Sequence, residues 1–545
     1  MRLPEYDYII VGSGSAGSVV ANRLSADPNC NILVLEAGGH DRNFWLKLPV
    51  GYFKTIYDPR FSRIFNTEPS EGDGHRGIVW PRGRIVGGSS SINGLVYIRG
   101  QHEGFEDWES LGAEGWTYEE ILSHFRQLER FGGRDDKYLG RDGDLAVSEL
   151  RNDNPACQAW IEAAKQYGLP ANPNFNGQST YGVGSYHLSI GKRLRASASV
   201  AFLHPALKRS NLTLQTHALV SRVELENGLA TGVTWTTNGK TYSAKAKREV
   251  ILCAGALQSP QILQLSGIGP TEVLKEHGIP VVVNSPEVGE NLQDHYQIRL
   301  LLKLTQKISL NDDVRNPIKL AKMGFDWLLK GRGPLTVGAG QVGGGACTEY
   351  ASPGRPDIQF NVMPLSVDKP GAPLHRYSGF TASFWQCHPE SRGTAHIQSP
   401  NPSKQPKIAP NYLSTKLDQN VMVAGVKLLR NIHSQPAFRH LWNEETVIGK
   451  DRQSDSEILE AIRTMGGTVF HPVGTCRMGN DSSSVVDPQL RVRGVQRLRV
   501  IDASVMPKIV SANTNAATLM VGEKGASIIL NETDLKNSIM AEELL

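Results

Sequence analysis

Residues 6–36 read YDYIIVGSGSAGSVVANRLSADPNCNILVLE, and this stretch decides the fold. Tyr6–Val11 is a short apolar run that contains β-branched residues, which predicts a buried strand. Apolar residues at helical spacing follow the glycine cluster of residues 12–17, and Ile32–Leu35 forms a second apolar run. The stretch therefore predicts a strand, a helix and a second strand, which is a βαβ unit of about the usual 30 residues.

The glycine cluster has the spacing Gly12-x-Gly14-x-x-Gly17. In such a turn the first glycine permits the tight bend, the second lets a pyrophosphate approach the backbone, and the third lets the helix pack on the strand. The N-terminus of the helix offers unpaired N–H groups to the phosphates. Glu36 lies nineteen residues beyond Gly17, where it would bind ribose hydroxyls and repel a 2′-phosphate. A glycine turn can be purely structural, but this context favours a site for FAD or NAD.

Composition indicates a globular protein with a small-molecule partner. The chain has 545 residues, 39% of them hydrophobic, which excludes disordered and fibrous proteins. Its net charge is +4 and its basic residues are scattered, so no nucleic acid partner is expected. Six dispersed cysteines without a C-x-x-C pair indicate buried thiols, with no metal site and no disulfide framework. We find no signal sequence and no apolar run of about 18 residues, and we expect a cytoplasmic protein without a transmembrane segment.

Two interleaved domains are expected. Apolar runs at 249–252 and 498–501 resemble the first strands, whereas 358–362 and 380–384 alternate as half-exposed antiparallel strands do. Helices near 319–329 and 418–432 would pack on these alternating strands. The predicted fold class is α/β (α+β overall), with a Rossmann-like nucleotide-binding domain of residues 1–155, 190–300 and 465–545. A substrate-binding domain of residues 156–189 and 301–464, an antiparallel sheet with helices, would be inserted into it.

A second glycine-rich block lies far from the first, at residues 80–94, which read WPRGRIVGGSSSING. Its backbone donors and small hydroxyls imply one ligand long enough to reach both blocks. Together with residues 255–269, GALQSPQILQLSGIG, the block resembles the signature regions of the glucose–methanol–choline (GMC) family of FAD-dependent oxidoreductases. The resemblance, closest to the choline and alcohol dehydrogenase branch, continues through residues 289–295, 389–393 and 471–525 and covers nearly the whole chain.

The resemblance implies FAD bound along the glycine turn, with Glu36 on the ribose and the backbone of Val220 at the adenine. It places Asn93 beside the isoalloxazine ring, and Asp502 and Ala503 near the pyrophosphate and ribityl chain. The residues expected to contact FAD are Gly12, Ser13, Gly14, Ser15, Ala16, Gly17, Glu36, Ala37, Arg84, Val86, Gly88, Ser89, Asn93, Gly94, Val96, Val220, Ala254, Asp502, Ala503, Asn513, Thr514 and Asn515. Some choline-oxidising relatives attach flavin to a histidine where this chain has Ile92, which has no nucleophile, so non-covalent FAD is expected.

The resemblance assigns the chemistry to residues 469–479 and 511–515. Oxidation of an alcohol at a flavin requires removal of the hydroxyl proton while a hydride leaves the carbon for flavin N5. A histidine suits this role because its ordinary pKa is about 6.5, and the family's histidine matches His471. The residue that orients the alcohol oxygen matches Asn513. Each residue also has a possible structural role. His471 could be a histidine of the core, and Asn513 could be the N-cap of a helix near 515–524. The positive end of that helix would face the flavin.

The expected function is oxidation of the CH–OH group of a primary alcohol to an aldehyde by a dehydrogenase that uses a quinone or another non-oxygen acceptor. An oxidase of the same family is an alternative, since Val469 resembles a small aliphatic residue at that position in some family oxidases. A hydroxynitrile-lyase-like enzyme with purely structural FAD is another. Val469, Phe470 and Trp385 are candidates for the substrate pocket, although aromatic residues equally often fill cores. The sequence leaves open the alcohol, the acceptor, the oligomeric state and peripheral membrane association.

Overall fold

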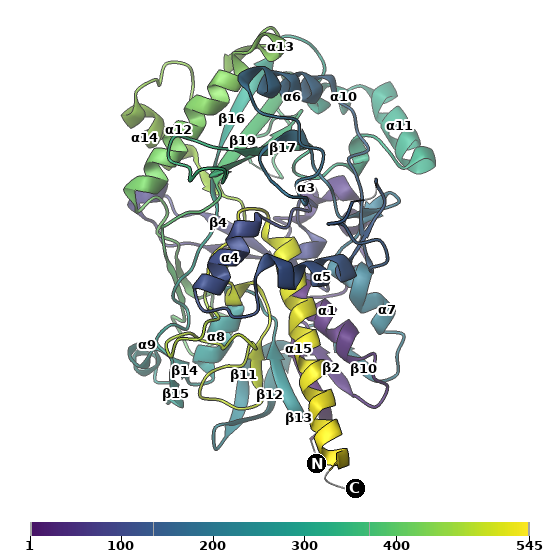
Figure 1. Cartoon of the computed structure of the whole chain (residues 1–545), viewed down its shortest axis with the longest axis vertical. Coiled ribbons are helices and arrows are strands. Elements are labelled where there is room, and N and C mark those ends of the chain that lie inside the picture. Colours follow the sequence, from purple (N-terminus) through teal and green to yellow (C-terminus); the bar gives the residue numbers. More distant parts are fainter. Residues whose placement is uncertain (1–2, 135, 370, 543–545) are drawn as a thin grey trace.

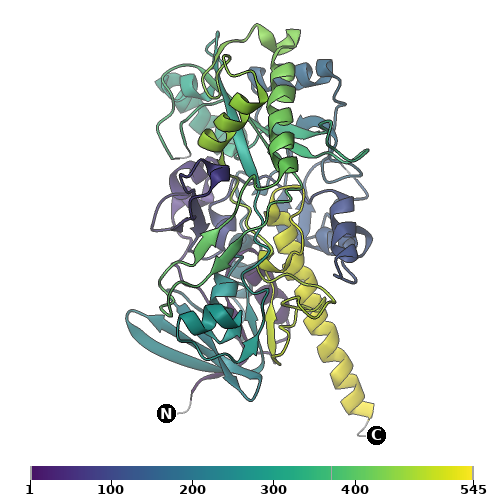
Figure 2. The ribbon, with the colours of Figure 1, turned by 90° about the vertical axis from the view of Figure 1, so that its left-hand side faces the viewer.

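A computed structural model of the chain describes residues 3–134, 136–369 and 371–542. Two bodies are stacked along the long axis, each built around its own sheet (Figure 1). The lower body holds a mostly parallel sheet, and the upper body holds an antiparallel sheet covered by helices. Helix α15 (Thr514–Glu542) starts near the middle of the molecule and runs to its lower end (Figure 2).

The lower sheet joins strands that are far apart in the sequence. The parallel strands are β10 (Leu212–Gln215), β2 (Ile32–Leu35), β1 (Glu5–Val11) and β13 (Lys240–Leu252), in this order, with β24 (Leu498–Val500) also on β13. Strands β12 (Leu229–Thr237) and β11 (Leu219–Glu226) continue the sheet in antiparallel pairing from the first half of β13. Helix α1 (Ser15–Leu24) joins β1 to β2, so the predicted strand–helix–strand unit is confirmed.

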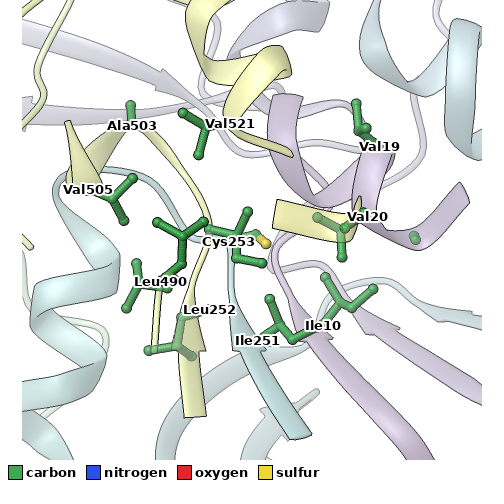
Figure 3. Close-up of a cluster of buried hydrophobic side chains, with 14 of the residues drawn as sticks. Ile10, Val19, Val20, Ile251, Leu252, Cys253, Leu490, Ala503, Val505 and Val521 are labelled. Atoms are coloured by element: carbon green, nitrogen blue, oxygen red, sulfur yellow. The ribbon is translucent and has the colours of Figure 1, made fainter. Parts of the chain in front are cut away.

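Helix α1 packs on the sheet through small and branched side chains. Val19 and Val20 of α1, Ile10 of β1 and Val521 of α15 belong to one buried cluster (Figure 3). A Cβ atom on Gly17 would lie 2.0 Å from the carbonyl oxygen of Gly12. The third glycine of the motif is therefore required for close approach of helix and strand, as predicted.

The upper sheet is antiparallel, in the order β17 (Val342–Ala346), β18 (Ile358–Met363), β19 (Gly379–Gln386), β16 (Tyr296–Leu304) and β22 (Trp442–Glu445). The short strand β23 (Gly467–Thr468) also pairs with β16. Helices α6 (Pro155–Tyr167) and α12 (Lys416–His433) share one hydrophobic core with the sheet. The predicted antiparallel sheet with helices is thus present.

The prediction that residues 380–384 are half-exposed is wrong. All eight residues of β19 are buried. In β18, Ile358, Phe360 and Val362 lie in the hydrophobic core, and the three residues that alternate with them lie on the opposite side. The opposite side faces the lower body across a cavity. There Asn361 and Ser383 line a cavity between the two bodies. The alternation therefore separates a core face from a cavity face.

The predicted helix near 319–329 does not pack on the sheet. Helix α11 (Pro317–Phe325) and the π-helical turn Asp326–Lys330 project from the upper body (Figure 1). Of α11, only Met323 is buried, and Ile318 is 80% exposed. The helix predicted at 418–432 does pack as expected, because α12 places Val421, Val426 and Leu429 in the core.

Further short helices and strands complete the two bodies. They include α2 (Phe44–Lys47), α3 (Tyr52–Thr55), β3 (Ser62–Asn66), β4 (Val79–Gly83), α4 (His102–Ser110), α5 (Tyr118–Leu128), α8 (Gln258–Leu265), α9 (Thr271–Glu276), α13 (Pro436–Arg439) and α14 (Asp455–Met465). The domain limits given above stay a prediction; the limit at 300/301 falls within β16. Within the described parts of the chain, no helix is long and apolar enough to cross a bilayer.

Candidate active site

A cavity of about 600 Å³ lies where the two bodies meet. Its lower wall is formed by the residues that follow the carboxyl ends of parallel strands: Gly12 after β1, Glu36 after β2, Ala254 after β13 and Asp502 after β24. Parallel strands end at the same edge of a sheet, and ligands of open α/β sheets bind at that edge. Four segments that are distant in the sequence therefore meet around one cavity.

The two glycine-rich blocks face each other across this wall. Gly12 has φ +102°, and a Cβ atom on it would lie 2.4 Å from the Cys253 carbonyl oxygen. Gly88, from the second block, has φ +53°, and its Cβ atom would lie 2.7 Å from the Cα atom of Gly14. Since Gly14 and Gly88 both line the cavity, one extended ligand can contact both blocks.

Glu36 is buried at one end of the cavity with its carboxylate held by the glycine turn. Oε2 accepts hydrogen bonds from the Ser13 N–H at 3.1 Å and the Ser13 hydroxyl at 2.7 Å, and Oε1 accepts from the Gly38 N–H at 2.8 Å. Burial raises the pKa of Glu36, while these hydrogen bonds oppose the rise. Oε1, which accepts only one of these hydrogen bonds, keeps acceptor capacity for a ribose hydroxyl.

At the other end of the cavity His471 lies beside Asn513. The Asn513 amide nitrogen is 3.2 Å from His471 Nε2, and both residues line the cavity. Asn513 directly precedes α15, and its Oδ1 is buried without a hydrogen-bond partner among the described residues. A buried acceptor without a partner is costly unless a ligand or water completes it. Asn513 Oδ1 is therefore a further polar group available to a bound molecule.

A second histidine fixes the tautomer of His471. His295 Nε2 is 3.2 Å from the Cys387 carbonyl oxygen, and His295 Nδ1 is 3.0 Å from His471 Nδ1. Because a carbonyl only accepts, a neutral His295 carries its proton on Nε2 and its Nδ1 is an acceptor. His471 must then donate from Nδ1, so its Nε2 is an unprotonated nitrogen that faces the cavity.

Burial keeps both histidines neutral. The pKa of His471 lies well below its ordinary value because of desolvation, with smaller contributions from His295 and Arg82. Desolvation lowers the pKa of His295 to about 3. A neutral imidazole with a free Nε2 is the form that a general base requires.

Asp294 fixes the backbone of His471. Its Oδ1 accepts from the His471 N–H at 2.7 Å, and its Oδ2 accepts from the hydroxyls of Thr468, at 2.6 Å, and Tyr412. Desolvation raises the pKa of Asp294 to about 6. The adjacent Phe470 has φ +67°, an unfavourable conformation for a bulky residue. Hydrogen bonds from the Arg82 guanidinium to its carbonyl, at 2.7 Å, and from its own N–H to Thr468, at 2.6 Å, hold it there.

Most of the residues predicted to bind a cofactor line this cavity. They are Gly12, Gly14, Ser15, Ala16, Glu36, Ala37, Arg84, Gly88, Ser89, Asn93, Gly94, Val96, Val220, Ala254, Asp502, Ala503, Asn513, Thr514 and Asn515, together with Ile92, Val469, Phe470 and His471. Ser13, Gly17 and Val86 are not on the cavity wall. Ser13 binds Glu36 and Gly17 packs against Gly12.

Trp385, a candidate for the substrate pocket, does not line the cavity. It is fully buried, and its ring centre is 6.0 Å from that of His471 and 5.9 Å from that of His295. Sequence reasoning missed the roles of Asp294, His295 and Arg82. Asp294 and His295 are the last two residues of the block 289–295. An acid next to a histidine within a signature block was the signal that could have identified them.

The cavity fits an elongated dinucleotide. It extends from the buried carboxylate of Glu36 to Asn513, and helix α1 begins at its wall with no side chain capping the first turn. Free N–H groups at a helix N-terminus bind phosphate. The Ser15 hydroxyl donates to Asn515 Oδ1 at 2.8 Å, so the N-termini of α1 and α15 meet at this wall. In the described parts of the chain, no cluster of side chains is suited to hold a metal ion.

Comparison with known proteins agrees with this geometry. The family model described as GMC oxidoreductase matches residues 6–297 with its N-terminal part and residues 389–522 with its C-terminal part. The chain is 40% identical over 540 residues to an alcohol dehydrogenase (acceptor) of Pseudomonas putida, covering 97% of this chain and 96% of that protein. It is also 40% identical to the mitochondrial choline dehydrogenase of Homo sapiens, covering 97% and 91%.

The fold is similar to that of a solved oxidase. The pyridoxine 4-oxidase described as from Mesorbium loti superposes with a TM-score of 0.87 at 29% identity, covering 96% of this chain and 98% of that one.

Proposed function

Because this chain belongs to the GMC oxidoreductase family, and is therefore an FAD-dependent oxidoreductase of CH–OH donors, we propose that it oxidises a primary alcohol to an aldehyde with His471 as the base. The observation that supports this role is the orientation of His471. Its Nδ1 is committed to His295, whereas its unprotonated Nε2 faces the cavity 3.2 Å from the Asn513 amide.

The residues at this end of the cavity are arranged to deprotonate a hydroxyl. An alcohol bound between His471 and Asn513 would give its proton to Nε2 of His471. The amide N–H of Asn513, which points at Nε2 in the free protein, would donate to the alcohol oxygen and fix its orientation. Asp294 holds the backbone of His471 in place during this transfer. Positioned base catalysis of this kind contributes about 10²- to 10⁴-fold.

FAD, when bound, supplies the acceptor for the hydride that leaves the alcohol carbon. The residues that would hold it are those that line the glycine-rich wall, with Glu36 at the ribose and the start of α1 at the phosphates. Arg84 and Asp502 also line this part of the cavity. His471, at the opposite end of the cavity, then lies where the isoalloxazine ring of FAD would be.

We propose that FAD is held non-covalently. Ile92 lines the cavity, is 98% buried and offers no nucleophile at the position where some relatives attach the flavin. Acid precipitation of the purified protein should release all the yellow colour into the supernatant. Colour retained in the washed pellet would show a covalent bond and contradict this part of the proposal.

We propose a dehydrogenase with a non-oxygen acceptor, such as a quinone. This proposal is supported by the relative named alcohol dehydrogenase (acceptor), with 40% identity, although another relative with 40% identity is named oxygen-dependent choline dehydrogenase and oxidases share the fold. After anaerobic reduction by an alcohol, the flavin colour should return slowly in air and rapidly with a soluble quinone. Rapid return in air would make the protein an oxidase.

The test of the proposed function is anaerobic titration of the holoprotein with a panel of primary alcohols. Bleaching of the oxidised flavin band by at least one alcohol, with formation of the aldehyde, is the expected result. A flavin that no primary alcohol reduces, with cyanide released from a cyanohydrin, would overturn it. The comparisons do not favour that lyase alternative, because the relatives are named alcohol and choline dehydrogenases.

A further inference from the structure

The roof of the substrate end of the cavity is the polar side of the upper sheet. Across three strands, Gln297 pairs with Trp385 and Trp385 with Gln359, forming one row next to His471. Two residues further along, Arg299 pairs with Ser383 and Ser383 with Asn361. Residues i and i+2 of a strand lie about 6.6 Å apart on the same face. The second row is therefore roughly 6.6 Å from the first row, which lies next to the base.

The first row is fixed to the segment that carries the base. Gln297 pairs with Gly467 of β23, and its side-chain amide donates to the Thr468 carbonyl at 3.0 Å. Only Val469 and Phe470 separate Thr468 from His471. Strand β16 thus holds Arg299, two residues beyond Gln297, in a fixed position relative to the segment that carries the base.

Arg299 brings a positive charge to the cavity wall. Its side chain is half-buried and lines the cavity together with Asn361 and Ser383. Two of its N–H groups donate to backbone carbonyls, that of Val367 at 3.4 Å and that of Asp368. A guanidinium has five N–H donors, so several are left for a ligand. Arginine stays charged at neutral pH even though burial lowers the pKa of this group.

No carboxylate of the described residues forms an ion pair with Arg299. Asp368 also lines the cavity and attracts Arg299, but its side chain is 84% exposed and pairs with His375 at 2.9 Å. Tyr57, the other titratable neighbour, is a phenol whose pKa burial raises, so it is neutral. Lys369 also lines the cavity and adds positive charge at its rim. Arg299 and Lys369 therefore outnumber Asp368, the one carboxylate on this part of the wall among the described residues.

The other acids of the cavity are engaged elsewhere. Glu36 is held by Ser13 and Gly38 at the opposite end. Asp502 accepts hydrogen bonds from the N–H groups of Gly255 and Ser504, each at 2.8 Å. The substrate end thus carries two positive charges, on Arg299 and Lys369, against one exposed carboxylate, on Asp368, which disfavours a quaternary ammonium.

We propose that Arg299 is the binding site for a carboxylate on the substrate, so that the preferred alcohols are hydroxy acids with a spacer between the two groups. The inference rests on the proposed function, because it places the hydroxyl at His471 and Asn513. The guanidinium binds the carboxylate through paired charge-assisted hydrogen bonds. The same charge repels choline, although choline dehydrogenases are among the relatives.

The test compares matched substrates with the holoprotein. Linear ω-hydroxy carboxylates of increasing chain length are each paired with their methyl ester and with the trimethylammonium alcohol of the same length. The measured quantity is the second-order rate constant for anaerobic flavin reduction. At the best chain length the carboxylate should exceed its ester by about 10- to 100-fold, the range of a hydrogen bond to a charged group. The ammonium alcohol should fall below the ester.

Two variants distinguish the loss of the Arg299 charge from the loss of hydrogen bonds to the neighbouring loop. In Arg299→Gln the ratio of carboxylate to ester should fall to within about threefold, since the charge-assisted pair is lost. Arg315 also donates to backbone carbonyls of this loop, those of Leu374, His375 and Arg376, but does not line the cavity. Arg315→Gln should therefore keep the full preference for the carboxylate.

Each contrary result identifies what is wrong. If the ester reduces the flavin as fast as the carboxylate at every length, the carboxylate site is disproved while the alcohol oxidation stands. If the preference persists in Arg299→Gln, or disappears in Arg315→Gln as well, Arg299 is not its source. If no alcohol, ester or acid reduces the flavin, the proposed function itself fails. Should Arg299→Gln not retain FAD, the comparison of substrates in the unmodified protein decides alone.

Discussion

At the level of single residues, the reactivity of His471 depends on its neighbour His295. The Nδ1–Nδ1 contact of 3.0 Å allows only one of the two nitrogens to carry the proton, and the Cys387 carbonyl decides which. Two buried rings and one backbone carbonyl thereby place the free lone pair of His471 on the side of the substrate.

Replacement of His295 should therefore impair catalysis through His471. In His295→Phe the acceptor for the His471 Nδ1–H is lost, and we expect flavin reduction to slow by about 10- to 100-fold, because an unpaired buried donor costs 1–3 kcal/mol. His295→Gln supplies a side-chain carbonyl and should recover part of the rate. Stopped-flow reduction by one alcohol measures both variants. Equal rates in His295→Phe and the unmodified protein would show that the tautomer is not set by this contact.

The pH dependence of flavin reduction should reflect the low pKa of His471. The base must be neutral, and a pKa well below the ordinary 6.5 means that it stays neutral as the pH falls through 6.5. We expect the rate constant to be flat from pH 8 to about pH 6 and to decline only in more acidic solution. A decline centred at or above pH 6.5 would contradict the proposed environment of His471.

The sequence predicted the residues whose role is local and missed those whose role depends on tertiary contacts. Gly12, Gly14 and Glu36 could be predicted because the turn and the strand end that position them lie within 31 residues. His295 and His471 are 176 residues apart in the sequence, and no sequence spacing indicates their contact. Trp385 was a candidate for the pocket because aromatic residues fill pockets and cores alike, and its place behind both histidines emerges only from the sheet register.

At the level of elements, the strand–turn–helix of residues 5–24 combines two kinds of glycine. Gly17 is needed by the fold itself, whereas Gly14 is needed by the cavity. A Cβ atom on Gly14 would meet nothing closer than 4.0 Å, and the residue has φ −71°, which alanine accepts. The two positions should therefore respond differently to the same substitution.

Gly14→Ala should weaken FAD binding without unfolding the protein. The added methyl group occupies space where the pyrophosphate approaches the backbone, so we expect the dissociation constant for FAD to rise at least about tenfold, or 1.4 kcal/mol. The melting temperature of the FAD-free protein should stay within about 2 °C, because a contact-free substitution changes stability little. Gly104→Ala in α4, where a Cβ atom also meets nothing within 4 Å, is the control and should leave FAD affinity unchanged. Unaltered affinity in Gly14→Ala would place the phosphates elsewhere.

The two helices predicted in the upper body show the limit of periodicity. Both α11 and α12 have apolar residues at helical spacing, but only α12 finds a sheet to cover. The pattern predicts that a helix forms and does not identify the surface on which it packs. Similarly, the alternation in β18 identified a strand with two unlike faces, and the second body that buries the polar face lies outside any local window.

At the level of the whole molecule, the fold class was predictable, because the strands β1, β2, β13 and β24 each end in a segment that the sequence singles out, whereas the edge strand β10 and the order of the strands were not predicted. The boundary between the two bodies was harder to predict from the sequence. Strand β16 begins directly after the signature block that contains His295 and yet belongs entirely to the upper sheet. Sequence resemblance therefore runs across the junction between the bodies, and the junction is where the cavity lies.

Buried histidines should make the folded state sensitive to acid. His187, His295, His433 and His471 are buried and have lowered pKa values, so the unfolded chain binds more protons than the folded one below pH 6.5. Stability must then fall as the pH falls, by about 1.4 kcal/mol for each histidine between pH 7.5 and 5.5. Asp294 acts in the opposite direction over part of this range, because its pKa of about 6 favours protonation of the folded state. His124 and His388, whose pKa values are also lowered, act with the four histidines, and the raised pKa values of Glu36 and Glu523 act with Asp294. Because the lowered histidines are more numerous, we expect a net loss of stability on acidification in urea unfolding.

His433 provides the control for this acid sensitivity. Both of its ring nitrogens are buried without a hydrogen-bond partner among the described residues, and it lies far from the cavity-lining set. In His433→Leu the loss of stability between pH 7.5 and 5.5 should shrink by about 1.4 kcal/mol. The same loss in this variant as in the unmodified protein would show that other groups cause the acid sensitivity.

The central claim, that His471 is the base of an alcohol oxidation, is tested most directly by the rate of anaerobic flavin reduction in His471→Ala. Both proteins should bind FAD, since His471 contributes no support to the glycine-rich wall. With one alcohol at saturating concentration, the variant should reduce its flavin about 10²- to 10⁴-fold more slowly than the unmodified protein, the range for loss of a general base. A variant that retains FAD and reduces it at the unmodified rate would remove His471 from the mechanism.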